Sequence, residues 1–192
     1  MSFHKEKLRV LFNRRRGSLS LRERTSASRQ ICRKIITLHF FNLSQNLAFY
    51  KAYNGEVNIN IVLTKAQKMG KNCYLPVLHK QCLIFYSYTR NTLVKNHFDI
   101  EEPDVSQEKS IYLNNLDLIF LPLVAFDEKG HRLGRGGGHY DQSLKSLKNQ
   151  YLKKPVLIGV SYECQRINKI PVERWDIPLD LVITEKTIYQ FS

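Results

Sequence analysis

Residues 116–126 read LDLIFLPLVAF, and the polar, glycine-rich stretch DEKGHRLGRGGGHYD follows them at 127–141. The apolar run predicts a buried strand, broken toward its far end by Pro122. Further apolar runs at 156–160 and 181–184 predict two more strands, with a helical stretch expected near residues 140–150. Continuously apolar strands that alternate with helices are typical of a mainly parallel sheet covered on both faces. We therefore predict an α/β fold.

The segments before residue 116 alternate in the same way. Ser20 and Glu23 have the spacing of a capping box and open a predicted helix. Pro76 suits the end of a strand better than its middle, and the polar residues 96–110 predict a surface loop. We expect helices over residues 4–15, from Ser20 onward and from Ile59 to Gly70, and strands over residues 46–50, 73–77 and 83–86.

The size and composition of the chain limit its class. Its 192 residues fit a single domain, 1–192, and 43% hydrophobic residues exclude a disordered chain. No apolar run approaches the roughly 20 residues of a membrane-spanning helix, and the first residues lack the apolar core of a secretory signal. We therefore expect a cytoplasmic protein that does not cross a membrane, with its four scattered cysteines reduced.

The formal charge of +13 indicates a polyanionic partner but does not choose among nucleic acid, a membrane surface and a polyphosphate ligand. The glycine-rich stretch is more specific. Four of the five residues 134–138 are glycine, an arrangement that lets backbone amides approach a ligand closely. Arg132 and Arg135 add guanidinium groups that suit phosphate or carboxylate oxygens. Asp141 suits two roles equally, as a helix cap or as a Mg²⁺ ligand.

These residues resemble a known family. LPLVAFDEKGHRLGRGGGHYD is similar to the 5-formyltetrahydrofolate cyclo-ligase motif P-x-x-A-F-D-x-x-G-x-R-L-G-x-G-x-G-Y-Y-D. Lys5 and Arg9 resemble the family's amino-terminal nucleotide contact, and Asn54-Gly55-Glu56-Val57 resembles its folate-facing turn. Residues 170–185 resemble its closing segment. Two departures are His139, where a tyrosine is usual, and Gly137, where some members carry lysine.

The resemblance implies a three-layer α/β domain like those of the ribose-5-phosphate isomerase and CoA-transferase group. It also implies that Mg²⁺ and ATP are used to phosphorylate the formyl oxygen of 5-formyltetrahydrofolate, so that N10 closes the ring to 5,10-methenyltetrahydrofolate with release of ADP and phosphate. This chemistry needs positioning and charge neutralisation rather than a nucleophile from the protein. The resemblance fits a monomer that binds no nucleic acid.

By the resemblance, Arg132 and Arg135 are the catalytic cations, and Asp141 and Asp176 are the Mg²⁺ ligands. The folate contacts are Lys51, Glu56, Arg135 and His139. The predicted ATP contacts are Lys5, Arg9, Arg132, Leu133, Gly134, Arg135, Gly136, Gly137, Gly138, His139 and Tyr140.

Simpler structural roles compete with several of these assignments. Without the resemblance, Lys5 and Arg9 fit an exposed basic pair on a helix. Glu56 fits a polar turn residue, and Asp176 a surface aspartate. Two other functions also remain open. One is a basic nucleic-acid-binding protein, favoured by Arg14-Arg15-Arg16, and the other is an ATP-using enzyme of this fold with a different substrate.

Overall fold

The computed structural model describes residues 3–96, 99–148 and 154–191, and within them the central sheet has eight strands. The two edges of the sheet are antiparallel, β12 (Ile188–Gln190) at one and β3 (Cys82–Ser87) with β6 (Ser110–Ile111) at the other. The α/β class with a mainly parallel sheet is confirmed. The parallel strands, in spatial order, are β11 (Leu181–Ile183), β10 (Val156–Val160), β7 (Leu118–Pro122), β1 (Asn46–Ala48) and β2 (Asn72–His79).

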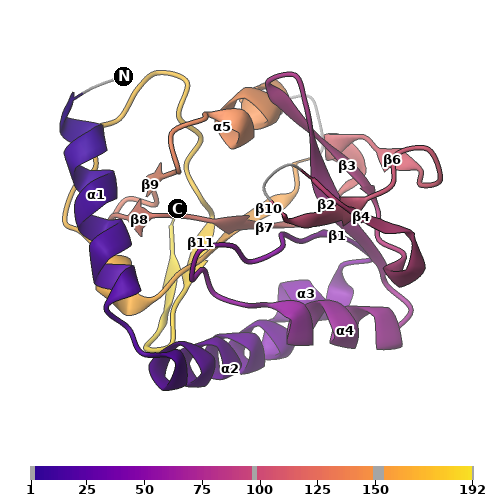
Figure 1. Ribbon diagram of the computed structural model, residues 1–192, viewed down its shortest axis with the longest axis horizontal. Helices are drawn as coiled ribbons and strands as arrows, with labels where there is room; N and C mark the ends of the chain where they lie inside the picture. Colours follow the sequence, from indigo (N-terminus) through magenta and orange to yellow (C-terminus); the bar gives the residue numbers. More distant parts are fainter. Residues whose placement is uncertain (1–2, 97–98, 149–153, 192) are drawn as a thin grey trace.

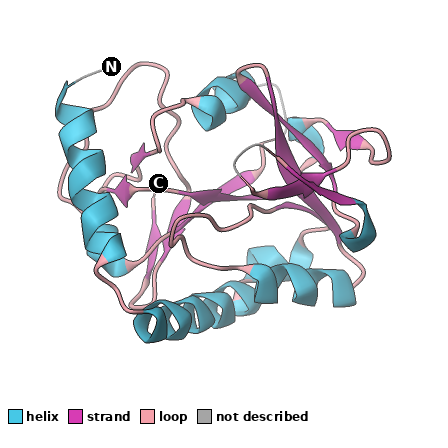
Figure 2. Cartoon of the chain, in the orientation of Figure 1, coloured by secondary structure: helices cyan, strands magenta, loops and turns pink. Residues whose placement is uncertain are grey.

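Helices cover both faces of this sheet (Figures 1 and 2). On one face lie α2 (Leu21–Thr37), α3 (His39–Leu43) and α4 (Asn60–Lys68), and on the other lies α5 (His139–Leu144), while α1 (Phe3–Gly17) stands at the side of the sheet. Short 3₁₀ turns occupy Arg90–Thr92, Leu113–Asn115, Lys145–Lys148 and Glu163–Gln165. In the part of the chain that is described, no helix has both the length and the apolarity to cross a membrane.

Strand β7 shows why its sequence is apolar without alternation. Leu118 and Phe120 pack into the core beneath α2 and α4, whereas Ile119 and Leu121 pack into the core beneath α5. A central parallel strand has no solvent face, so all four of the residues from Leu118 to Leu121 are buried.

The predicted helix signals act as expected. The Ser20 hydroxyl accepts the amide hydrogen of Glu23, and the Glu23 carboxylate accepts that of Ser20, so the capping box is confirmed. Gly70 ends α4 with φ +71°, and the next amide, that of Lys71, returns to the carbonyl of Ala66.

Pro76 lies in the middle of β2 and not at its end, so that prediction was wrong. The register explains why the sheet tolerates it. β1 pairs with β2 only as far as Tyr74, and beyond this point the neighbour on that side has ended. A residue without an N–H is acceptable where one edge of a strand is open.

The region around residues 96–110 is not simply a loop. β4 (Leu93–Lys95) and β5 (Glu101–Pro103) form a separate antiparallel pair, and β6 follows at 110–111; residues 97 and 98 lie outside the described part. The predicted strand at 116–126 is also divided. β7 ends at Pro122, and β8 (Ala125–Phe126) turns back to pair with β9 (Arg132–Leu133). The helix expected near 140–150 is α5 with its 3₁₀ turn, and residues 149 and 150 are not described.

The connections of the sheet reverse direction between β1 and β7. From β1 the chain continues to β2 on one side, whereas β7 leads to β10 and β11 on the other. Open α/β sheets bind ligands at such a switch point, outside the carboxyl ends of the strands. The residues that follow β1 and β7 are therefore the place to look for a site.

Candidate active site

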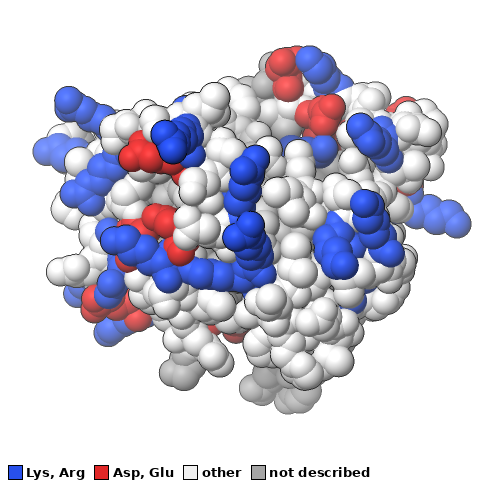
Figure 3. All heavy atoms as spheres, turned by 90° about the horizontal axis from the view of Figure 1, so that it is seen from below, with Lys and Arg blue, Asp and Glu red and all other residues white. Residues whose placement is uncertain are grey.

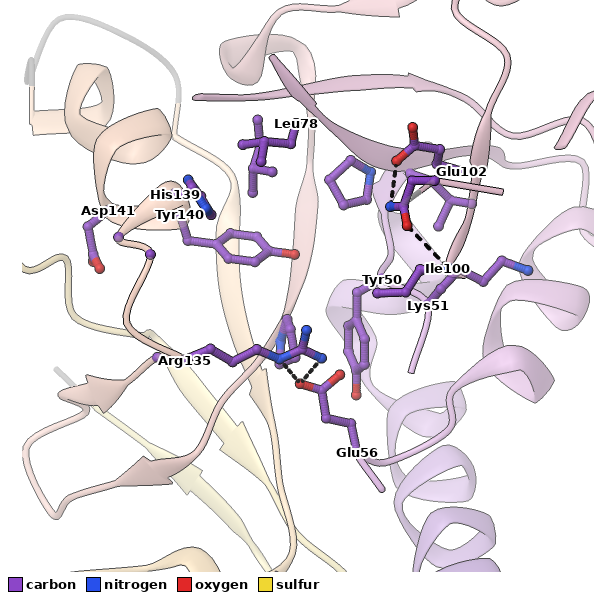
Figure 4. A pocket seen from close by; sticks show the side chains of 18 of the residues that line it. Tyr50, Lys51, Glu56, Leu78, Ile100, Glu102, Arg135, His139, Tyr140 and Asp141 are labelled. Carbon is purple, nitrogen blue, oxygen red and sulfur yellow. Dashed lines mark hydrogen bonds and ion pairs between the residues drawn. The ribbon is translucent and has the colours of Figure 1, made fainter. Parts of the chain in front are cut away.

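A cavity of about 230 Å³ opens at this switch point, and Tyr50 after β1 and Pro122 at the end of β7 form part of its floor. Figure 4 shows the phenol of Tyr140 pointing into it, with Glu56 and Arg135 meeting below the ring. Its lining is Tyr50, Lys51, Glu56, Leu75, Pro76, Leu78, Leu83, Asn96, Ile100, Glu101, Glu102, Pro122, Arg132, Gly134, Arg135, Gly137, Gly138, His139, Tyr140 and Asp141.

The β8–β9 hairpin positions the glycine loop, residues 134–138. Asp127 braces its turn, since one carboxylate oxygen accepts the amides of Lys129 and His131 and the other accepts that of Ile170. Burial would raise the pKa of Asp127, but these hydrogen bonds outweigh it and hold the pKa below the ordinary value. Asp127 is therefore part of the support for the loop.

Within the loop, Gly136 and Gly138 have positive φ values of 116° and 66°. Gly138 is the residue before α5, and no side chain caps the helix there. Asp141 lies in the first turn of α5, but its Oδ1 accepts hydrogen bonds from Arg132 Nη2 (2.6 Å) and the amide of Ile177 (3.4 Å). The helix-cap interpretation of Asp141 is therefore wrong.

Arg132 is held inside the protein. Its side chain is 4% exposed, and besides Asp141 it donates through Nη1 to the carbonyl of Ile177. Burial lowers the pKa of this guanidinium, and the nearby carboxylate of Asp141 opposes the shift.

Arg135 spans the cavity instead. From the glycine loop its Nε and Nη2 reach Glu56 Oε1 at 3.0 and 2.7 Å, and its guanidinium lies 4.9 Å from the ring centre of Tyr53. The Arg135 side chain is 45% exposed, whereas that of Glu56 is 3% exposed. Glu56 is thus more than a polar turn residue, because its second oxygen also accepts the amide of Tyr53 at 3.1 Å.

Helix α1 closes the other side of the loop. Arg9 Nε donates to the carbonyl of Gly134 at 2.9 Å, and Lys5 Nζ lies 2.9 Å from Asp176 Oδ2. Asp176 Oδ2 also accepts the amide of Glu173. Both basic side chains are largely buried, so they are not an exposed pair on a helix, and Asp176 is not a free surface aspartate.

The remaining predicted residues fall into two groups. Lys51 lies at the cavity rim, where it pairs with Glu101 (3.0 Å), and His139 Nδ1 lies 3.3 Å from the carbonyl of Gln81. Leu133, in contrast, packs in a small core with Phe12, and its carbonyl accepts the amide of Val124. The structure therefore brings the predicted folate contacts to the cavity, together with Arg132, Tyr140, Asp141 and most of the loop, and places Lys5, Arg9 and Asp176 just beyond the loop.

Sequence reasoning missed a whole wall of this cavity. Leu75, Pro76 and Leu78 come from β2, and Ile100, Glu101 and Glu102 come from β5 and the residue before it. The alternation of apolar residues at 73, 75 and 77 indicated which side of β2 is buried, but no local signal in residues 99–103 placed them beside the glycine loop.

Known proteins share this architecture and sequence. A sequence model of the 5-formyltetrahydrofolate cyclo-ligase family matches residues 1–185. The chain belongs to that family. The 5-formyltetrahydrofolate cyclo-ligases of Haemophilus influenzae and Escherichia coli (strain K12) are 35% and 34% identical to it, over 91% and 94% of this chain and 94% and 100% of their own lengths.

The fold comparison agrees with the family. The solved structure of Aquifex aeolicus 5,10-methenyltetrahydrofolate synthetase has a TM-score of 0.84 and 31% sequence identity, and the match covers 97% of this chain and 92% of that one. As a cyclo-ligase, the chain is a ligase of folate one-carbon metabolism, and ATP use comes with the family. The resemblance to the 5-formyltetrahydrofolate cyclo-ligase family is therefore confirmed.

Proposed function

We propose that this cyclo-ligase converts 5-formyltetrahydrofolate to 5,10-methenyltetrahydrofolate in the cavity beside the glycine loop. The γ-phosphoryl group of ATP passes to the formyl oxygen, and ADP leaves. N10 then attacks the activated formyl carbon, loses its proton, and the carbon–oxygen bond breaks to release phosphate. One observation supports this proposal. Groups suited to bind phosphate, Arg135 and the glycine amides, line a cavity that is otherwise mostly apolar.

The cavity suits a flat, partly polar ring system. Leu75, Leu78 and Leu83 give it apolar walls, and the phenol of Tyr140 projects into it (Figure 4). Burial raises the pKa of Tyr140, so the hydroxyl stays neutral and can donate or accept a hydrogen bond. Glu56 and Lys51 lie on the opposite side as charged groups that fix the orientation of a bound folate.

The protein's task in such a reaction is positioning. N10 and the formyl group belong to one molecule, so their approach depends on how the folate is held. The negative charge that develops on the transferred phosphoryl group requires fixed donors. Arg135 suits this role because it is half-exposed and reaches the cavity from the loop, and Lys5 and Arg9 extend the positive side toward α1.

The carboxylates near the loop fit a magnesium ion bound with the nucleotide. Asp141 and Asp176 each use one oxygen, Oδ1 and Oδ2 respectively, for the hydrogen bonds described above. Among the described residues no three His, Cys, Asp or Glu side chains cluster, and Mg²⁺ commonly takes one or two carboxylates and completes its shell with phosphate and water. When bound, the ion would neutralise phosphate charge.

The direct test supplies purified protein with 5-formyltetrahydrofolate, ATP and Mg²⁺. We expect near-ultraviolet methenyl absorbance to rise in step with phosphate release, one phosphate for each ring closed. Reactions without ATP, and with ADP in its place, are the controls. Folded protein that releases no phosphate and forms no methenyl product would refute the proposal.

The basic surface does not favour nucleic acid as an alternative ligand. Of Arg14-Arg15-Arg16, the third is buried, and Arg15 stacks on Phe12 at 4.7 Å. On the face seen in Figure 3, basic side chains stand in separate groups with acidic ones among them. Labelled RNA titrated in rising salt checks this point, since a phosphate-binding surface would lose affinity steeply with salt.

A further inference from the structure

A second cavity, of about 330 Å³, lies against the same glycine loop. Gly137, Gly138 and Asp141 line both cavities, so this short stretch of chain separates them. Its lining is more polar than that of the first, and its residues are Gln81, Gly137, Gly138, Asp141, Gln142, Lys145 and Trp175.

Trp175 is the one tryptophan of the sequence, and it is 58% exposed. The residues on either side of it are anchored. The carbonyl of Arg174 accepts a hydrogen bond from Lys148 Nζ, and the carboxylate of Asp176 pairs with Lys5. The backbone therefore holds the indole at the cavity although little of the protein packs against it.

An indole in this position has the properties of a stacking surface. Aromatic rings bind nucleobases through their faces, and the interaction tolerates different bases because each has a π-face. Trp175 is next to Asp176, a predicted magnesium ligand, and the cavity it lines ends at the glycine loop, the predicted phosphate site. Lys145, on the same lining, adds a cation.

We propose that Trp175 is the stacking surface for the base of the nucleoside triphosphate, with the phosphates directed toward Gly137, Gly138 and Asp141. The nucleotide then occupies the second cavity and the folate the first, and phosphoryl transfer takes place across the loop between them. This inference rests on the proposed ATP-dependent reaction and adds the part of the site that recognises the base.

Fluorescence gives a direct readout, because no other residue of the chain contains an indole. Titration with ATP in the presence of Mg²⁺ should quench or shift the emission of Trp175. Inorganic tripolyphosphate carries the phosphates without the base. It should compete with ATP in calorimetric titrations but leave the emission nearly unchanged.

Variants separate stacking from a structural role. Trp175→Ala should weaken ATP binding about tenfold and leave tripolyphosphate binding unchanged, whereas Trp175→Phe should keep most of the affinity. Tyr112→Ala is the matched control, since this aromatic residue is 81% exposed and lines neither cavity. Melting temperatures confirm that each variant is folded. If Trp175→Ala does not fold, the fluorescence of the wild-type protein and the ATP affinity of Trp175→Phe still test whether Trp175 stacks on the base.

Two results would overturn the inference. Equal losses for ATP and tripolyphosphate would mean that Trp175 only positions Asp176 or the loop. No loss for ATP, with wild-type emission indifferent to the nucleotide, would place the base elsewhere. Turnover of 5-formyltetrahydrofolate by the wild-type preparation is measured alongside, so that a failure of this inference is distinguished from a failure of the proposed function.

Discussion

Two arginines only three positions apart illustrate two uses of the same side chain. Arg132 is enclosed, with its guanidinium shared between Asp141 and the carbonyl of Ile177. Arg135 is half-exposed and reaches across the cavity to a buried carboxylate on a different segment, Glu56. The first therefore holds the cavity wall together, whereas the second keeps part of its guanidinium open to an anionic ligand while Glu56 holds it in place.

This contrast modifies what the sequence suggested, namely that both arginines face the ATP phosphates. A guanidinium that is itself enclosed, as that of Arg132 is, is poorly placed to adapt to a ligand, because moving it would break its hydrogen bonds to Asp141 and the carbonyl of Ile177 inside the protein. We expect Arg132 to act mainly through the geometry of Asp141 and Arg135 to act on the substrates.

Replacing Arg132 with alanine is expected to have the largest effect. Loss of this enclosed guanidinium leaves the carbonyl of Ile177 and the partly buried carboxylate of Asp141 without their donor, so the free energy of unfolding should fall by about 3 kcal/mol. For a chain of this size the melting temperature should drop by about 6–12 °C. Urea and thermal unfolding measure the change, and Arg132→Lys is the control that keeps the charge but loses the second hydrogen bond. Wild-type stability of Arg132→Ala would remove the distinction between the two arginines.

Replacing Arg135 with alanine should instead lower turnover. We expect kcat/KM to fall about ten- to a hundredfold, the range of one charge-assisted contact, with a loss of unfolding free energy of about 1 kcal/mol or less. The stability effect is small because Arg135 is half-exposed, and because the carboxylate of Glu56 keeps the amide of Tyr53 as a donor and the guanidinium of Arg16 as a nearby cation. Steady-state kinetics and unfolding curves on one preparation measure the change in kcat/KM and the change in unfolding free energy. An unfolding loss as large as that of Arg132→Ala would contradict the comparison.

The aspartates allow the contrast to be tested through magnesium. Asp141→Asn keeps an acceptor for Arg132 but removes the negative charge, so turnover should fall about tenfold at low Mg²⁺ and recover partly when Mg²⁺ is raised. Kinetics over a range of Mg²⁺ concentrations measure this response. In the double variant with Asp176→Asn, the effects should not add if both carboxylates serve one ion. Small, additive effects at every Mg²⁺ concentration would contradict the assignment of Asp141 and Asp176 as Mg²⁺ ligands.

The smallest effect is expected at Gly137, within the loop that carries Arg135. A Cβ at this position would come within 2.5 Å of His139 Nε2, so the imidazole must move away from the carbonyl of Gln81. Because a side chain gives way rather than backbone, Gly137→Ala should change turnover by about threefold or less and stability by about 0.5 kcal/mol. In the double variant Gly137→Ala, His139→Ala the clash is absent, so its turnover should equal that of His139→Ala alone. Failure of this rescue would show that the glycine itself is required.

Much of the fold was predictable because its signals are local. The apolar run of β7, the Ser20 capping box and Gly70 each depend on residues that are neighbours in the sequence, and each was identified correctly. The β4–β5 pair was not predicted, since each of its strands has only three residues, too few for an apolar pattern to be recognised.

The candidate site divides in the same way. The glycine loop and its arginines stood out by composition, but their different roles depend on partners far away in the sequence. Arg132 meets Ile177, and Arg135 meets Glu56, which lies 79 positions earlier. The residues next to each arginine in the sequence do not indicate which distant residue it will contact. Only the folded chain therefore shows that Arg132 is enclosed and Arg135 is available to a ligand.

The contact between Lys5 and Asp176 joins positions that are 171 residues apart. During synthesis at about 5–20 residues per second, Lys5 is added to the chain roughly ten to thirty seconds before Asp176. For that interval Lys5 cannot form this ion pair, and the proposed nucleotide side of the site is incomplete. The site is therefore completed only when almost the whole chain has been translated. A chain released before that point would be inactive.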